Sequence, residues 1–206
     1  DLKGLVTMSS PLPVTISNLV SLPIRCYQKS FLRGDFLSLE SDLLWRLEHG
    51  FIRSVIWNYD GQAATLGLWG PGDTIGKILS QTEDCELECL APVLMNGFPL
   101  PRISADELQE ATMSHLRQSQ TLLKILHCRP MPLRFLKLLI WLAHRFGYPV
   151  DQGWQLDLRL THQTLAEIIG TTRVTVTRML GVFEREGKIK QLHQHRYFLS
   201  GYDILA

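Results

Sequence analysis

Residues 161–180 read THQTLAEIIGTTRVTVTRML, and this stretch decides the fold of the C-terminal part of the chain. Its apolar spacing predicts a helix, a tight turn at Gly170, and a second helix that begins at a threonine cap. The second helix carries Arg173 and Arg178, and arginines placed in this way can pair bidentately with guanine in the major groove of DNA. The same pattern also forms ordinary corners between two helices, so DNA binding is a hypothesis at this point.

Polar side chains around this motif are candidates for contacts to the DNA backbone, which position a protein without reading the base sequence. Threonine hydroxyls suit phosphate oxygens, and basic side chains near the following hairpin add positive charge. The backbone contacts that the sequence predicts are Thr161, His162, Thr172, Thr175, Thr177, Lys188, Lys190 and Arg196.

The net charge of +1 argues against a nucleic-acid binder, but the charges are unevenly distributed. Residues 1–128 hold 10 Lys and Arg against 14 Asp and Glu, a balance of −4. Residues 129–206 hold 11 against 6, a balance of +5. The basic part therefore contains the helix–turn–helix motif, which fits attraction to phosphate.

Several classes of protein are disfavoured by what the sequence lacks. No uninterrupted apolar run approaches the roughly 18–20 residues of a membrane span, and no signal peptide is visible, so a cytoplasmic protein is expected. Because the chain begins at Asp1, natural residues before it are expected to be missing. No nucleophile–base pair, phosphate loop or metal-ligand spacing occurs, so we expect no enzyme, cofactor or metal. The cysteines at 26, 85, 89 and 128 are expected to be mostly buried structural thiols.

Short strands separated by turns are expected from Ile24 to about Leu100, after an extended or weakly helical lead-in over residues 1–23. An Asp-Gly pair ending at Gly61 is typical of a hairpin turn. This spacing favours a sandwich or barrel-like β unit. The expected strands cover residues 43–48, 51–57, 62–69, 85–90 and 93–98.

A long amphipathic helix is expected over residues 104–128, where Ser104 and Glu107 form a capping-box pattern. Its apolar face must be buried, either on the β unit of the same chain or against a second subunit in a parallel coiled coil. The length of the stripe favours pairing, so we expect a homodimer. The predicted interface residues are Leu108, Leu116, Leu122, Leu123 and Leu126.

Residues 129–206 are expected to hold a helix over 133–146, a strand over 154–160, the helix–turn–helix and a terminal hairpin. The hairpin lies between Lys188 and Leu199 and would form a wing beside the two helices. The domains expected from these patterns are therefore 1–103, 104–128 and 129–206.

The order of these units resembles the bacterial CRP/FNR family of transcription regulators. The resemblance is loose in the first hundred residues and close after residue 145. Within residues 146–181, FGYP and LDLRLTHQTLAEIIGTTRVTVTRMLG are especially similar to the cyanobacterial nitrogen-control regulators of the NtcA type. The implied fold class is α+β. It comprises an N-terminal β-roll, which is a jelly roll like the cyclic-nucleotide-binding domain, a dimerisation helix and a winged helix-turn-helix.

The resemblance also implies a function, transcription regulation through double-stranded DNA, in nitrogen control and with RNA polymerase as a further partner. Arg173, Val174 and Arg178 match positions that contact bases in the family. Many relatives carry glutamate at the position of Val174, which can accept a bond from cytosine, whereas valine offers contact to a thymine methyl group. The resemblance therefore implies a palindromic site of the GTA…TAC kind.

The family's effector pocket is implied in the β unit, but the charges there disfavour cyclic AMP. Cyclic-AMP binders carry a Gly-Glu pair and a later arginine, whereas this chain has Gly76-Lys77 and then four carboxylates within Thr82–Glu88. Those carboxylates would repel an anionic ligand. The NtcA type binds 2-oxoglutarate, also an anion, with an arginine in the same strand, and the resemblance aligns Cys85 with that arginine, which disfavours 2-oxoglutarate as well. The implied pocket residues are Gly76, Lys77, Cys85, His115, Arg117 and Gln120.

Two hypotheses about regulation stay open. In the first, a small molecule other than cyclic AMP gates DNA binding. In the second, binding is independent of any effector, and the β unit is a scaffold or a docking surface for polymerase or another protein.

Overall fold

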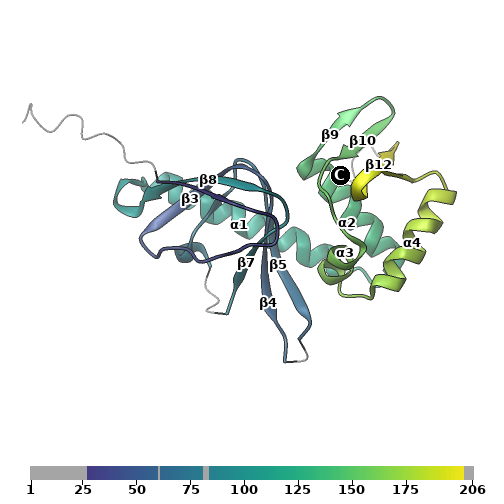
Figure 1. The fold of residues 1–206 in the computed structure, drawn as a ribbon, viewed down its shortest axis with the longest axis horizontal. Coiled ribbons are helices and arrows are strands. Elements are labelled where there is room, and N and C mark those ends of the chain that lie inside the picture. Colours follow the sequence, from purple (N-terminus) through teal and green to yellow (C-terminus); the bar gives the residue numbers. More distant parts are fainter. Residues whose placement is uncertain (1–26, 60, 81–83, 202–206) are drawn as a thin grey trace, which may run out of the picture.

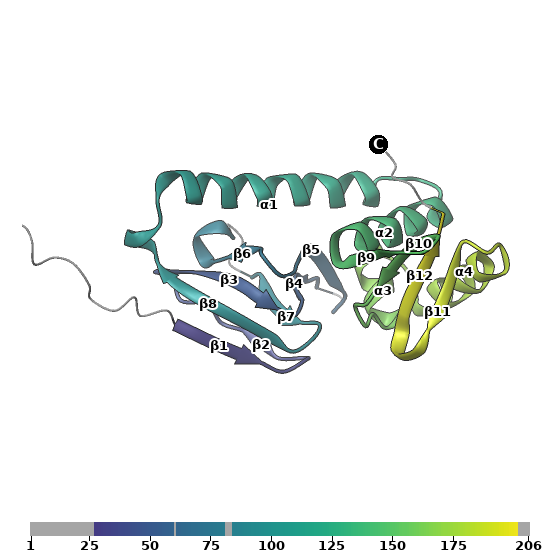
Figure 2. The ribbon, with the colours of Figure 1, turned by 90° about the horizontal axis from the view of Figure 1, so that it is seen from above.

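A computed structural model describes residues 27–59, 61–80 and 84–201 (Figure 1). The lead-in expected over residues 1–23, Cys26, and Thr82 and Glu83 of the carboxylate-rich segment lie outside the described residues. The described chain forms a β-roll at one end, a long helix along it, and a smaller helical and β domain at the other end (Figure 2).

The β-roll consists of two antiparallel four-stranded sheets that pack face to face. One sheet has the order β1-β8-β3-β6 and the other β2-β7-β4-β5. This confirms the expected jelly-roll-like unit, although β1, β2 and β6 were not predicted. The strands are β1 Tyr27–Phe31, β2 Phe36–Leu37, β3 Leu43–His49, β4 Ile52–Trp57, β5 Ala63–Trp69, β6 Thr74–Ile75, β7 Glu86–Cys89 and β8 Val93–Pro99.

Large side chains from both sheets fill the space between them, with Trp45 and Ile52 fully buried at its centre. Cys89 belongs to the same cluster and is also fully buried, as expected for a structural thiol. Burial raises the pKa of this thiol to about 12, so it carries no thiolate at neutral pH.

The long helix α1, Ala105–Leu126, runs along the β-roll and reaches the second domain (Figure 2). Its start is the predicted capping box: the Ser104 hydroxyl accepts a bond from the Glu107 amide at 3.2 Å, and the Glu107 carboxylate accepts one from the Ser104 amide at 2.8 Å. The helix ends two residues earlier than expected. Among the described residues, no helix is long and apolar enough to cross a membrane.

The second domain combines helices with one antiparallel sheet of order β11-β12-β10-β9. Its core surrounds Phe135, Leu138 and Tyr197, none of which is exposed. The elements are α2 Met131–Phe146, β9 Gly147–Val150, β10 Gly153–Leu156, α3 His162–Ile169, α4 Arg173–Arg185, β11 Ile189–Leu192 and β12 Arg196–Ser200. The winged helix-turn-helix architecture is thus confirmed.

The strands next to helix α2 differ from the expectation. The strand expected over residues 154–160 ends at Leu156, and strand β9, which contains Pro149, was not predicted. Gly147 follows helix α2 with extended dihedral angles. A Cβ atom there would lie 2.4 Å from the Gln155 carbonyl oxygen and 2.5 Å from that of Ala143, so glycine permits this close approach.

The two domains are packed against each other, because α3 lies on β5 and Leu68 belongs to the core cluster of the second domain. Phe51 of the β-roll meets Phe146 of α2 edge to face, with ring centroids 5.2 Å apart. The orientation of the helix–turn–helix is therefore set by contacts with the β-roll.

Candidate nucleic-acid interface and effector pocket

The helix–turn–helix is built by local hydrogen bonds at its caps and turn. Thr161 caps α3 by accepting a bond from the Thr164 amide at 3.0 Å, and Thr172 caps α4 by accepting one from the Thr175 amide at 3.2 Å. Gly170 ends α3 in the left-handed region with φ 70°, as the sequence predicted for the turn. The Thr161 and Thr172 hydroxyls are thus already engaged in capping.

One face of α4 is buried against the domain and the opposite face is exposed. Val176, Met179 and Leu180 point into the core. Arg173 and Arg178 are exposed on the other side. The predicted base-contact residues therefore share one open face, together with Val174, which is 78% exposed.

His162 and Thr177 join the two helices of the motif. The Nδ1 atom of His162 lies 2.8 Å from the Thr177 hydroxyl, and its ring meets His195 edge to face at 5.6 Å. Burial, followed by the charges of His195 and Arg173, lowers the pKa of His162. This histidine therefore links α3 to α4 and to the segment between β11 and β12.

The wing carries cations that are partly neutralised. The Lys188 ammonium lies 2.6 Å from the Glu186 carboxylate. The Arg196 guanidinium lies 3.0 Å from the Asp157 carboxylate. Lys190 on β11 is exposed. These partners reduce the positive charge that the sequence alone suggested for the wing.

Helix α1 leaves an apolar stripe uncovered in the protomer. Met113 is 42% exposed, Leu116 is 49% exposed and Leu123 is 56% exposed. These residues, with exposed Gln120, follow the three- and four-residue steps of a heptad seam.

Three of the leucines predicted at the dimer interface do not belong to this stripe. Leu122 is only 3% exposed and packs in the core of its own protomer. Leu126 packs against the same cluster, and Leu108 is half-buried and lies outside the exposed stripe. Leu116 and Leu123 are the predicted interface residues that remain available to a partner.

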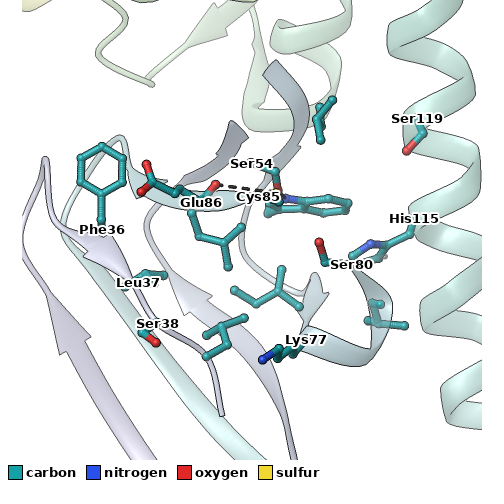
Figure 3. Close-up of a pocket in the computed structure, with 17 residues that line it drawn as sticks. Phe36, Leu37, Ser38, Ser54, Lys77, Ser80, Cys85, Glu86, His115 and Ser119 are labelled. Atoms are coloured by element: carbon teal, nitrogen blue, oxygen red, sulfur yellow. Dashed lines mark hydrogen bonds between the residues drawn. The ribbon is translucent and has the colours of Figure 1, made fainter. Parts of the chain in front are cut away.

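A pocket of about 770 Å³ lies between the sheets of the β-roll and α1 (Figure 3). Four of the six implied effector residues line it, namely Gly76, Lys77, Cys85 and His115. The other two do not: Gln120 is exposed on α1, and the Arg117 guanidinium pairs with the Glu110 carboxylate at 2.5 Å on the surface. The helix turns their side chains away from the pocket.

Sequence reasoning missed much of the lining. Ser54, Trp69 and Ser119 face the pocket from β4, β5 and α1. The Trp69 indole donates a bond to the Ser54 hydroxyl at 2.6 Å. Alternation along the two strands could have placed Ser54 and Trp69 inside the roll, but their distance from α1 could not be predicted.

His115 connects the pocket to helix α1. Its ring stacks on Trp69 with centroids 4.0 Å apart, and its Nε2 donates a bond to the Thr74 carbonyl oxygen at 2.7 Å. Burial lowers the pKa of His115 and outweighs the bond to Thr74 and the charge of Asp73, which act in the opposite direction. The ring is therefore neutral at neutral pH.

The carboxylates expected to repel anions are only partly at the pocket. Glu86 is part of the lining, and its carboxylate accepts a bond from the Trp57 indole at 2.6 Å. Glu88 does not line the pocket and instead pairs with Arg53 at 2.5 Å. Glu88 therefore does not contribute to the repulsion of an anion that the sequence predicted at the pocket.

Two polar contacts cross from the β-roll to the second domain. Arg53 of β4 is 5% exposed and pairs with Glu88 of β7 and, at 2.6 Å, with Glu167 of α3. Arg145 of α2 donates bonds of 2.7 Å and 2.8 Å to the carboxylate of Asp73. No local sequence pattern predicts the two interdomain pairs, because Arg53–Glu167 and Arg145–Asp73 each join residues more than seventy positions apart.

Comparison with known proteins relates both parts of the chain to transcription regulators. Residues 133–202 match the Crp-like helix-turn-helix domain. The chain is 41% identical over 152 residues to the regulatory protein CysR of Synechococcus elongatus, and the alignment covers 72% of each protein. It is 39% identical over 92 residues to a global nitrogen regulator of the same species, covering 45% of this chain and 41% of that protein.

Solved structures share the fold over most of the chain. A CRP-family transcriptional regulator from Thermus thermophilus has a TM-score of 0.69 at 25% identity, covering 84% of this chain and 91% of that chain. A cyclic nucleotide-binding domain containing protein from Listeria monocytogenes has a TM-score of 0.73 at 12% identity, covering 85% and 89%. At that identity the second likeness concerns the fold alone.

Proposed function

Because this chain belongs to the CRP/FNR family of transcription regulators, we propose that it is a homodimer that binds a palindromic DNA site in the cytoplasm. The observation that carries this proposal is the exposed face of α4, where Arg173, Val174 and Arg178 lie together. A helix that presents two arginines on one open face suits the major groove. No catalytic role is proposed.

Base reading is assigned to Arg173, Val174 and Arg178. An arginine can take the O6 and N7 atoms of guanine, and Val174 can contact a thymine methyl group. This favours a GTA…TAC palindrome. Thr175, Thr177 and His162 would contact the backbone beside α4, with Thr161 and Thr172 at the helix starts. The wing cations Lys188, Lys190 and Arg196 would add charge.

Dimerisation is assigned to the exposed stripe of α1, with Met113, Leu116, Gln120 and Leu123 at the seam. Two such helices in parallel would bury the stripe by coiled-coil packing. The recognition helices of the two protomers would then lie about 34 Å apart, one turn of DNA.

Gating by a small molecule is assigned to the pocket in the β-roll. The pocket wall includes His115 and Ser119 of α1, so a ligand there touches the proposed dimer helix from its inner side. His115 is bonded to Thr74, the neighbour of Asp73, which holds Arg145 of the second domain. A ligand that shifts this group would bias the orientation of the DNA-binding domain.

The alternative is an effector-independent regulator whose β-roll docks RNA polymerase or another protein. Trp57 is 50% exposed and Tyr59 is fully exposed in the connection between β4 and β5, which would suit a protein partner. DNA affinity that is unchanged across 2-oxoglutarate, cyclic AMP, cyclic di-GMP and cell extract would favour this alternative.

Selection of bound duplexes from a random DNA pool tests the DNA-binding proposal. The protein should enrich GTA…TAC palindromes, and Val174→Glu should shift the preferred base toward cytosine, which glutamate can accept a bond from. Val174→Ala is the matched control and should keep the arginine-dependent part of the site. Recovery of no common sequence by the wild-type protein would rule the proposal out.

A further inference from the structure

The pocket in the β-roll is lined by polar and apolar side chains in similar proportion, and its buried wall is apolar apart from Ser54. Leu37, Leu66 and Leu87 contribute side chains from one sheet, and Ile75 contributes one from the other. The lining also carries hydroxyl groups, of which that of Ser54 belongs to a buried residue and those of Ser38, Ser80 and Ser119 to exposed ones (Figure 3). Its volume of about 770 Å³ falls within the roughly 300–1,000 Å³ of small-molecule sites.

Formal charges in the described lining cancel. Lys77 and Glu86 are its charged residues, and both are exposed. The Glu86 carboxylate is bonded to the indole of Trp57, a half-exposed side chain outside the pocket, so it is turned toward the outer surface. The described lining holds no buried cation, because Lys77 is exposed.

The polar side chains of the lining other than Lys77 and Glu86 are neutral. In neutral His115 the Nε2 proton is given to Thr74, which leaves Nδ1 as an acceptor. Serine hydroxyls can donate or accept hydrogen bonds, but they carry no charge that would neutralise a buried ion. An anion placed here would lose its hydration without gaining a buried cation, which is unfavourable.

We infer that this pocket binds an uncharged, largely apolar molecule that carries a few hydrogen-bonding groups, and that it discriminates against anions. The inference deepens the proposed gating function and rests on it for its biological meaning. The apolar walls would supply the affinity, and the serine hydroxyls and His115 would orient the ligand.

Two dyes with the same ring skeleton test this inference. N-phenyl-1-naphthylamine is uncharged, and 8-anilinonaphthalene-1-sulfonate adds one sulfonate. Fluorescence titration of the full chain should give a dissociation constant at least about tenfold lower for the uncharged dye, since the sulfonate must be buried unpaired. Equal affinity, or tighter binding of the sulfonate, would overturn the inference.

An arginine introduced into the pocket wall tests whether the dyes bind in this pocket. Cys85→Arg places a cation in the lining, so it should weaken binding of the uncharged dye and tighten binding of the sulfonate by about tenfold. Ser80→Arg makes the same test from the rim if Cys85→Arg fails to fold. Leu32→Arg is the matched control, because Leu32 is 72% exposed outside the pocket and should alter neither affinity.

If both pocket variants behave like Leu32→Arg, the dyes bind elsewhere and the inference is wrong. The dye measurements need no DNA. Loss of the proposed DNA-binding function would therefore appear separately, as failure to select a duplex while the preference between the two dyes persists.

Discussion

Val174 is an apolar side chain left open to solvent at the start of α4, between two exposed arginines. Its position could be predicted from the sequence, because residues 173, 174, 177 and 178 necessarily share one face of a helix with 3.6 residues per turn. The capping threonines were equally predictable as parts of the motif. What could not be predicted is that His162 bonds to Thr177 and that acidic partners lie beside Lys188 and Arg196.

Arg178 provides the sharpest residue-level prediction. Arg178→Ala should lower affinity for the selected palindrome by about 1–3 kcal/mol and relax base preference, because one bidentate contact is lost. Fluorescence anisotropy with matched and scrambled duplexes measures both effects. Arg33→Ala, an exposed charge on the β-roll, is the control and should change neither. Equal losses on the two duplexes would contradict a base-reading role.

His115 predicts a dependence of stability on pH. Burial lowers its pKa in the folded protein, so below about pH 6.5 the unfolded chain binds a proton that the folded chain takes up only at lower pH. The free energy of unfolding should therefore fall as the pH drops through this window. Chemical denaturation at several pH values measures the slope.

His115→Gln should make that slope shallower. His193→Gln is the control, since it removes an exposed histidine instead of a buried one. A slope in His115→Gln that equals the wild-type slope would contradict the assignment.

Helix α1 could be predicted from the sequence, but which of its side chains point into the protomer could not. Leucines lie at adjacent positions 122 and 123, so periodicity alone allowed either to point inward. In the structure Leu122 enters the protomer core and Leu123 is 56% exposed. The same rotation of the helix brings His115 into the pocket and keeps Arg117 and Gln120 out of it. The deciding contacts come from distant strands, and no local pattern contains them.

Leu123→Glu should convert the proposed dimer to monomer, because a charge would be buried opposite its copy in the coiled coil. The protomer should stay folded, since this side chain is already exposed within it. Sedimentation velocity measures the oligomeric state. Leu133→Glu is the control at another exposed leucine, 43% exposed on α2, and should leave the dimer intact. A dimer that survives Leu123→Glu would place the interface elsewhere.

At the scale of the whole molecule, Arg53 joins the two domains through Glu88 on one side and Glu167 on the other. The resemblance of the sequence to a known family predicted both domains, yet it said nothing about how they meet. That arrangement depends on single side chains from β4, β7 and α3, whose proximity is created only by folding.

Glu167→Gln should lower the free energy of unfolding by about 1–3 kcal/mol, because it weakens a charged hydrogen bond to a nearly buried guanidinium. Glu110→Gln is the matched control, since the pair between Glu110 and Arg117 is largely exposed and should be worth less than about 1 kcal/mol. Urea denaturation compares the two variants. Similar losses in both would show that the interdomain pair contributes no more than a surface pair.

The β-roll and the winged domain lie at opposite ends of the long axis (Figure 1), and the chain is acidic in its first part and basic in its last. The protomer is therefore an electric dipole whose positive pole is the winged domain. In a parallel dimer the two dipoles would point in the same direction and reinforce each other. As such a dimer diffuses toward DNA, the electric field of the DNA would orient the dimer so that the two α4 helices face the DNA before contact. The fraction of collisions that are productive would then be set by ionic strength, even where the affinity of the final complex is high.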